Sequence, residues 1–172
     1  MEITKLFMDT EFTGLHQQTS LISVALIDET GQRFYAELND YKKCQCDDWI
    51  IKNVIGNLKH KHIMSMPELR KNLLNWLSSY VRVEIWGDCI SYDWVLFNEI
   101  FGGAFNLPRN IYYIPFDLCT LFKFRGINPD IDREEFLGIN KSVSKHNALW
   151  DTHIIKKCYE KLMRVNFDGT LL

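Results

Sequence analysis

No run of about 18 apolar residues occurs in this sequence of 172 residues, so no segment has the length of a transmembrane helix. The first residues, from Met1 to Lys5, also lack the basic start, apolar stretch and small-residue cleavage site of a signal peptide. These two absences predict a cytoplasmic protein that has no membrane partner.

An excess of charge of one sign is also missing. The 20 Lys and Arg residues nearly balance the 22 Asp and Glu residues, which leaves a formal net charge of −2. Proteins that coat nucleic acid or an anionic membrane through bulk charge are strongly basic, and the sequence excludes that class. A local basic groove, or a site that needs its own carboxylates, is compatible with this charge.

Cysteine pairs at metal-binding spacing are missing as well. Cys44 and Cys46 stand too close together for a CxxC zinc pair, and no second Cys or His pair follows at zinc-finger spacing. The cysteine count of 5 is odd, and cytosolic thiols are normally reduced. We therefore expect neither structural zinc nor a disulfide framework. Because repeats, low-complexity tracts and Pro-rich or Gly-rich linkers are also absent, residues 1–172 are expected to form a single domain.

Hydrophobic periodicity predicts strands first and alternating helices and strands afterwards. Residues 20–28 and 32–38 flank a Glu-Thr-Gly turn and predict a β-hairpin. The later strand–helix–strand units need crossover connections. This order predicts an α/β domain in which helices flank a mixed sheet. The expected strands are residues 3–9, 20–28, 32–38, 82–87 and 111–116, and the expected helices are residues 47–55, 65–80, 91–101, 117–124 and 147–164.

Four carboxylates and one histidine fall at the ends of expected strands and at the starts of expected helices. Asp9 and Glu11 stand two residues apart at the end of the first strand, so their side chains point to the same side. Asp93 lies near the start of the helix that follows the fourth strand. Asp151 lies in the last helix, five residues after His146 at the edge of that helix.

Carboxylates gathered in this way suit two divalent cations. Mg²⁺ and Mn²⁺ prefer carboxylate oxygens and water, and without metal the clustered acids would repel one another. Two such ions about 3.5–4 Å apart can clamp a phosphodiester, activating the attacking water and stabilising the leaving oxygen. A histidine beside that water can accept its proton, because its ordinary pKa is about 6.5. The sequence thus predicts metal-dependent hydrolysis of a phosphodiester.

Each of these signals also has a plainer interpretation. An acid at a strand end is commonly a solvated turn residue, and an Asp at a helix start is commonly an N-cap. Asp88, at the end of the fourth strand, competes with Asp93 for the third metal position, although no aromatic residue directly precedes it. The basic run at residues 59–62 fits either a solvated loop or a contact to substrate phosphates. The tryptophans expected in the core are Trp49, Trp76, Trp86 and Trp94.

Taken in order, three motifs resemble the DEDDh branch of the DnaQ-like 3′→5′ exonucleases, which have a ribonuclease-H-like fold. The first motif, D-x-E, is residues 9–11, within a longer string that is similar to RNase T and oligoribonuclease. The second motif, an aromatic residue followed by Asp, is Tyr92-Asp93, and the third, H-x-A-x-x-D, is residues 146–151. Within the branch, residues 21–35 and 86–93 look most similar to the RNase AS-like exoribonucleases.

The resemblance implies a role for each matching position. Asp9 would bridge two Mg²⁺ or Mn²⁺ ions, and Glu11, Asp93 and Asp151 would complete the metal sites directly or through water. His146 would be the general base, and Glu11 would serve catalysis as well as metal binding.

The resemblance also implies that residues after the first motif hold the 3′-terminal nucleotide. Phe12 and Thr13 would contact the sugar and its 3′-hydroxyl, and Leu15 would pack on the terminal base. Trp150 adjoins a motif residue and is a candidate for base stacking, which contributes about 1–3 kcal/mol per base. Two positions depart from the usual pattern of relatives. Trp150 is bulky for its position, and Thr152 stands where relatives often have Ala.

The function implied is a metal-dependent 3′→5′ exoribonuclease that acts on RNA ends or short oligoribonucleotides and releases nucleoside 5′-monophosphates. Such relatives commonly form homodimers, and a homodimer is expected here. A 3′→5′ exodeoxyribonuclease of the proofreading kind, acting on single-stranded DNA, would have the same site, because the difference rests on contacts to the 2′-hydroxyl. An inactive relative that only binds nucleic acid would be expected to lack a motif residue, and all five are present.

Overall fold

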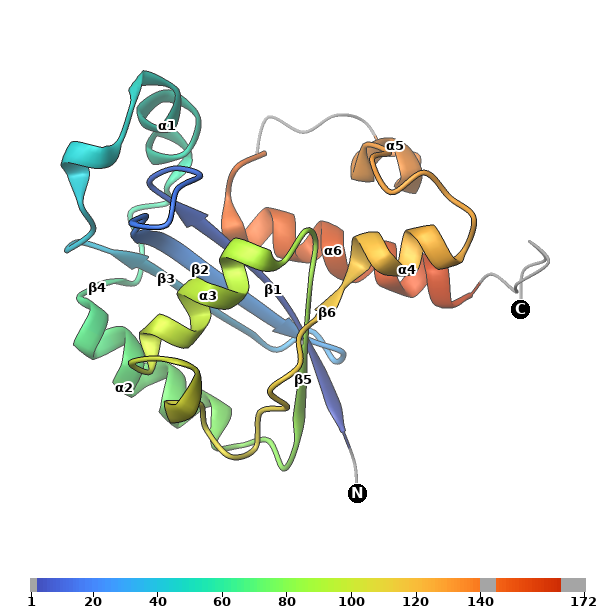
Figure 1. Cartoon of the computed structure of the whole chain (residues 1–172), viewed down its shortest axis with the longest axis horizontal. Helices are drawn as coiled ribbons and strands as arrows, with labels where there is room; N and C mark the ends of the chain where they lie inside the picture. Colours follow the sequence, from blue (N-terminus) through green and yellow to red (C-terminus); the bar gives the residue numbers. More distant parts are fainter. Residues whose placement is uncertain (1–2, 140–144, 165–172) are drawn as a thin grey trace.

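The computed structural model describes residues 3–139 and 145–164, which form a mixed sheet with helices on both faces (Figure 1). The strand order across the six-stranded sheet is β4-β3-β2-β1-β5-β6. β1 lies centrally: it pairs antiparallel with β2 and parallel with β5. The strands are β1 Thr4–Phe12, β2 Leu21–Asp28, β3 Arg33–Leu38, β4 Ile63–Met64, β5 Val83–Gly87 and β6 Phe116–Asp117.

The helices divide between the two faces of the sheet, with α2 and α3 on one face and α4 and α6 on the other. Local sequence explains where they begin. Ser65 and Glu68 form a capping box at the start of α2, and the Asn147 side chain accepts a hydrogen bond at the start of α6. The helices are α1 Asp48–Asn53, α2 Met66–Leu77, α3 Ser91–Ile100, α4 Leu118–Phe124, α5 Arg133–Leu137 and α6 Ala148–Met163.

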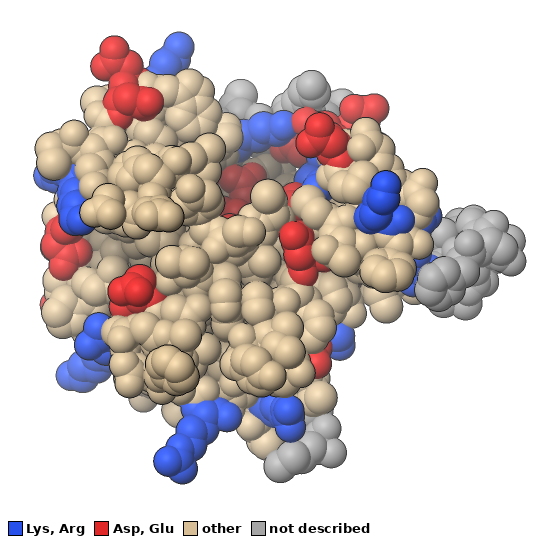
Figure 2. Space-filling view, viewed as in Figure 1, with Lys and Arg blue, Asp and Glu red and all other residues tan. Residues whose placement is uncertain are grey.

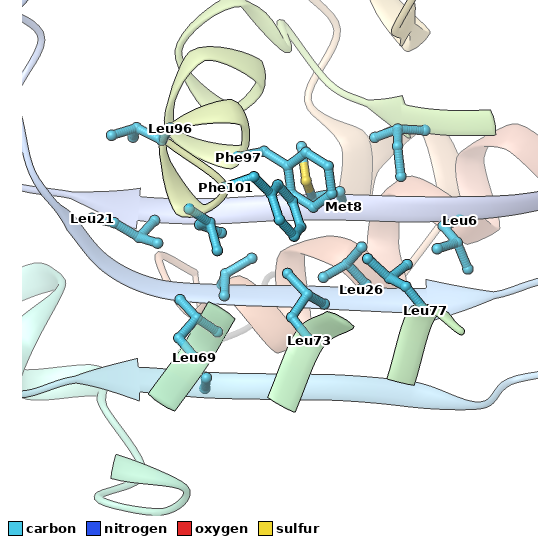
Figure 3. Packing of buried hydrophobic residues seen from close by; sticks show 14 of the residues in the cluster. Leu6, Met8, Leu21, Leu26, Leu69, Leu73, Leu77, Leu96, Phe97 and Phe101 are labelled. Atoms are coloured by element: carbon cyan, nitrogen blue, oxygen red, sulfur yellow. The ribbon is translucent and has the colours of Figure 1, made fainter. Parts of the chain in front are cut away.

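Alternation along β1 explains why both faces of the sheet are covered. Leu6 and Met8 point into a core shared with α2 and α3, which Figure 3 shows. Phe7 points the other way and packs on Tyr159 of α6, with ring centroids 5.2 Å apart. A strand buried on both sides holds its register firmly, and β1 is the strand that ends in the first acidic motif.

The structure confirms the predicted fold class, a ribonuclease-H-like mixed sheet whose antiparallel hairpin precedes strand–helix–strand units. None of the helices in the described part of the chain is long and apolar enough to cross a membrane. A single domain over residues 1–172 stays a prediction.

Three details differ from expectation. The strand expected over residues 111–116 is wrong, because only Phe116–Asp117 forms a strand and Ile111 makes a single bridge to Val83. Pro115 has no N–H to donate within this stretch, and β6 lies at the edge of the sheet, where such interruptions are tolerated.

Helix α5 was not expected, although its sequence carries start and stop signals. Asp132 caps it by accepting hydrogen bonds from two backbone N–H groups, and Gly138 ends it with a left-handed φ of 72°. The 2-residue strand β4 was also missed, because so short an element leaves no periodicity to detect.

Candidate active site

Carboxylates from β1 and α6 meet at the C-terminal end of β1. Asp9 and Glu11 follow Phe7 at alternate positions, so they lie on the face of the sheet that α6 covers. Asp151 enters the same place from the first turn of α6. Each of these three residues offers an oxygen within 4.8 Å of the others.

Asp93 approaches this group from α3. Its Oδ1 accepts hydrogen bonds from the backbone N (2.9 Å) and the Oγ1 (2.6 Å) of Thr10, the residue between Asp9 and Glu11. The Asp93 side chain is therefore fixed to β1, and its charge acts on both neighbouring acids. We call Asp9, Glu11, Asp93 and Asp151 the carboxylate cluster.

The carboxylate cluster resists ionisation. Burial raises the pKa of Asp9 well above its usual range, and the charges of Asp93, Glu11 and Asp151 raise it further. Burial and the Asp151 and Asp93 charges raise the pKa of Glu11 to about 8. Burial also raises the pKa of Asp93 and Asp151 to about 6, although hydrogen bonds oppose the shift in both. Buried, mutually repelling carboxylates are the donor set that hard divalent cations bind and neutralise.

Asp88 lies close to the cluster but already has a cationic partner. Arg133 forms a bidentate ion pair with Asp88, in which Nε lies 2.7 Å from Oδ2 and Nη2 lies 2.8 Å from Oδ1. The Cys119 thiol donates to the same carboxylate at 3.2 Å, and burial followed by the Asp88 charge raises the pKa of this thiol to about 12. This geometry favours Asp93 over Asp88 as the third acidic position. We call Asp88, Arg133 and Cys119 the ion-pair group.

His146 stands just before α6 with an exposed side chain and a left-handed φ of 61°. The next residue, Asn147, donates its backbone N–H to Asp151 Oδ2 at 3.1 Å, which ties the histidine segment to the carboxylate cluster. Partial burial and the charge of Lys145 lower the pKa of His146. The neutral imidazole, which can accept a proton, is therefore favoured near neutral pH.

Two cavities meet at this site, and Figure 2 shows acidic side chains deep in a hollow of the surface. The larger cavity, about 710 Å³, is lined on its outer part by Phe12, Leu15, Trp49 and Tyr92. The smaller one, about 420 Å³, lies beside α5 and the ion-pair group. Residues that line both cavities are Asp9, Asp88, Cys89, His146 and Asp151.

Residues 4–163 match the 3′-5′ exoribonuclease Rv2179c-like domain. The chain belongs to this family. A similar protein is the 3′-5′ exoribonuclease Rv2179c of Mycobacterium tuberculosis strain H37Rv, 25% identical over 125 residues that cover 70% of this chain and 74% of that protein. Family membership confirms the resemblance to DEDDh 3′→5′ exonucleases and the prediction that the chain is an enzyme of this class.

Solved structures share the fold at low sequence identity. S. pombe Pop2p, in a Mg²⁺- and Mn²⁺-bound form, has a TM-score of 0.68 and 15% identity, covering 96% of this chain and 85% of that one. Cell-death related nuclease 4 has a TM-score of 0.69 and 12% identity, covering 93% of this chain and 63% of that one. An E. coli exonuclease I–single-stranded DNA complex has a TM-score of 0.63 and 17% identity, covering 95% of this chain and 40% of that one.

Two of the four residues expected to bind substrate line the larger cavity of this exonuclease fold. Phe12 stacks on Tyr92, with ring centroids 5.5 Å apart, and Leu15 is 79% exposed at the cavity edge. Thr13 is buried instead. Its Oγ1 donates to Gln45 Oε1 at 2.7 Å, and this bond holds the loop between β1 and β2.

Trp150 does not reach either cavity. Its Nε1 donates to Glu134 Oε1 of α5 at 3.2 Å, and the ring packs with the α4–α6 core. The tryptophan at the site is Trp49, which was expected in the core but is half exposed and contacts the His146 ring edge-on at 4.8 Å. The sequence carries no clear signal for this role, because the short helix α1 also exposes Ile51.

The basic run at residues 59–62 lies at the surface and lines neither of the two cavities at the site. His60 and His62 have left-handed φ angles of 52° and 55°. The backbone N–H of Lys59 donates to Glu37 Oε1 at 2.6 Å, so this loop is attached to β3. The described contacts favour the solvated-loop interpretation of the run.

Proposed function

We propose that this chain is a metal-dependent 3′→5′ exoribonuclease that cleaves single-stranded RNA or short oligoribonucleotides from the 3′ end. The products would be nucleoside 5′-monophosphates, released one at a time. The observation that carries the proposal is the convergence of Asp9, Glu11 and Asp151 within 4.8 Å, with Asp93 fixed beside them. RNA is favoured over DNA because the matching family is one of exoribonuclease domains.

The carboxylate cluster would hold two Mg²⁺ or Mn²⁺ ions, and Asp9 would contribute to holding both. Its oxygen donors and raised pKa values fit hard divalent cations, and Pop2p, which shares the fold, has a form with both kinds of ion bound. When bound, the ions would supply a nucleophilic water and stabilise charge on the leaving oxygen.

His146 would take the proton from the attacking water. Its lowered pKa keeps the imidazole neutral at the working pH, and it lines both cavities together with Asp9 and Asp151. The backbone N–H of Asn147 would hold the Asp151 carboxylate in position beside this histidine.

The two cavities would receive the substrate on either side of the carboxylate cluster. A 3′-terminal nucleotide fits the larger cavity, where Phe12, Leu15 and Trp49 offer apolar surface to a sugar and base. With the phosphodiester at the carboxylate cluster, the preceding nucleotide would lie on the other side, toward the smaller cavity. Homodimerisation, a cytoplasmic location and a single domain over residues 1–172 belong to the same proposal, on the strength of the resemblance and the sequence.

A time course on 5′-labelled RNA and DNA of matched sequence tests the activity, with Mg²⁺, Mn²⁺ or a chelator present. We expect RNA to shorten in one-nucleotide steps from the 3′ end, only with divalent metal, and faster than DNA. Equal rates in chelator would contradict the metal requirement. Faster cleavage of DNA would identify the exodeoxyribonuclease instead, and shortening from the 5′ end would overturn the direction.

A further inference from the structure

One residue outside the carboxylate cluster, Asn57, contacts the chain on both sides of His146. Asn57 ends the 3-10 turn Ile55–Asn57, which follows α1. Its Nδ2 donates to the carbonyl oxygen of Lys145 at 2.8 Å, and its own carbonyl oxygen accepts from Asn147 Nδ2 at 3.0 Å. Asn57 is therefore hydrogen-bonded to the residue before His146 and to the residue after it.

The backbone of His146 needs such support. Its φ of 61° lies in the left-handed region, which residues with a Cβ rarely adopt. Conformations of this kind persist where surrounding contacts hold them in place. Other contacts of this segment are the ion pair between Lys145 Nζ and Asp132 Oδ2, which lies near the surface, where ion pairs hold weakly, and the edge-on contact of the Trp49 ring with His146.

Asn57 is itself firmly anchored. Its Nδ2 also donates to the carbonyl oxygen of Asn53 at 2.6 Å, which joins it to α1. Ile50 and Val54 bury this segment against Ile22 of the sheet. Asn57 thus connects the histidine segment to the α1 segment, which itself packs on the sheet. Asn57 lines neither cavity at the site and makes no contact with the carboxylate cluster among the described hydrogen bonds.

We propose that Asn57 is a positioning residue for His146. Its side-chain amide holds the backbone carbonyl of Lys145, and its own backbone carbonyl holds the side chain of Asn147, so that the imidazole keeps its place in the cavity wall beside Asp151. The proposal rests on the proposed function, in which His146 is the general base. In this proposal Asn57 acts on the reaction through His146. Because Asn147 also donates to Asp151, an effect through a metal ligand would instead raise the Mg²⁺ concentration that the reaction needs.

The test compares Asn57→Asp with wild type, using the full chain and a short oligoribonucleotide with Mg²⁺. The substitution keeps the side-chain size but replaces the Nδ2 donor with an oxygen that repels the Lys145 carbonyl. We expect kcat to fall about tenfold or more, because small misplacements of a reacting group can cost up to about 10²-fold. KM and the Mg²⁺ concentration for half-maximal rate should stay within about twofold of wild type.

Asn110→Asp is the matched control. Asn110 Nδ2 also donates to two backbone carbonyls, those of Leu77 and Tyr80 at 2.8 and 2.9 Å, but it lies outside both cavities at the site. Its substitution should lower the melting temperature by a similar amount and leave kcat unchanged. If Asn57→Asp does not fold, Asn57→Ala replaces it, since that variant keeps the carbonyl bond to Asn147.

The decisive step repeats Asn57→Asp in a His146→Ala background. A positioning residue that works through His146 has no further effect on kcat there, so the expected additional loss is none. An equal loss in both backgrounds, or an unchanged kcat in the single variant, overturns the proposal. If His146→Ala alone leaves kcat unchanged, the general base of the proposed function is wrong, and that failure is distinguishable from a failure of Asn57 alone.

Discussion

Acidic residues in the same hollow belong to two groups of side chains that have opposite electrostatic states. In the ion-pair group, Arg133 compensates Asp88 through two hydrogen bonds at 2.7 and 2.8 Å. The carboxylate cluster makes no ion pair with a Lys or Arg of the described residues, and the pKa values of all four acids are raised. Closely spaced acids alone do not define a metal site. What supports the proposed metal site is that the buried acids have no Lys or Arg partner among the described residues, so that their charge can be compensated by cations from solution.

The largest effect is expected when the carboxylate cluster loses Asp9, the proposed ligand of both ions. Asp9→Asn should reduce turnover about 10³-fold or more, since metal binding supplies several kcal/mol of stabilisation to the transition state. The variant should also melt at a higher temperature than wild type in chelator, because one buried repulsive charge is gone. Single-turnover cleavage and thermal unfolding measure the two effects. Glu29→Gln, a surface acid paired with Lys5, is the matched control. Full activity of Asp9→Asn would sink the two-metal proposal.

The sharpest test of the comparison sets Asp93→Asn against Asp88→Asn. Asp93→Asn should lower turnover about 10²-fold and leave the fold intact, since a metal ligand is weakened. Asp88→Asn should instead cost about 2 kcal/mol of unfolding free energy, because Arg133 loses a charged hydrogen-bond partner. Kinetics and chemical denaturation of both variants separate these outcomes. If Asp88→Asn alone is inactive, the assignment of the third acidic position is reversed.

Stability against pH should follow the carboxylate cluster in the absence of metal. With the pKa of Glu11 raised to about 8 and those of Asp93 and Asp151 to about 6, the folded state binds more protons than the unfolded chain above about pH 4. The free energy of unfolding should therefore fall as pH rises from about 4 to about 8.

Magnesium should reverse this loss. At about 100 times its Kd it stabilises the folded state by about 2.7 kcal/mol, and the gain should be larger at high pH, where the cluster is ionised. Thermal unfolding with chelator and with Mg²⁺ at several pH values measures both trends. A melting temperature that is independent of Mg²⁺ at high pH would show that the cluster is not a metal site.

How far the site could be predicted from the sequence depended on how local each feature is. Asp9 and Glu11 share a face because alternation along a strand is local. The choice between Asp88 and Asp93 was not local, because the deciding residue, Arg133, lies 45 positions away in the chain from Asp88. The fold class, like the shared face of Asp9 and Glu11, could be predicted from local patterns, because it follows from the order of strongly periodic segments.

The segment before α6 shows where local reasoning ends. Five helical steps separate His146 from Asp151 and would turn the two side chains apart. They share the cavities because the helix begins at Ala148, with Asn147 as its cap and His146 in a left-handed conformation. Histidine adopts that conformation more often than most residues that have a Cβ, but still so seldom that the sequence does not predict it here. Asn57, which contacts both flanks of His146, comes from a distant turn.

The smallest effects are expected from two tryptophans, Trp49 near the carboxylate cluster and Trp150 near the ion-pair group. Trp49 lines the larger cavity and contacts His146, whereas Trp150 bonds to Glu134 of α5, the helix that carries Arg133. Trp49→Ala should raise KM for a short oligoribonucleotide about fivefold or more, since stacking contributes about 1–3 kcal/mol per base. Trp150→Ala should lower the melting temperature and leave KM near the wild-type value, because its ring is part of the core. Steady-state kinetics and thermal unfolding of both variants measure these effects. A raised KM in Trp150→Ala with an unaltered KM in Trp49→Ala would show that Trp150, and not Trp49, stacks on the base.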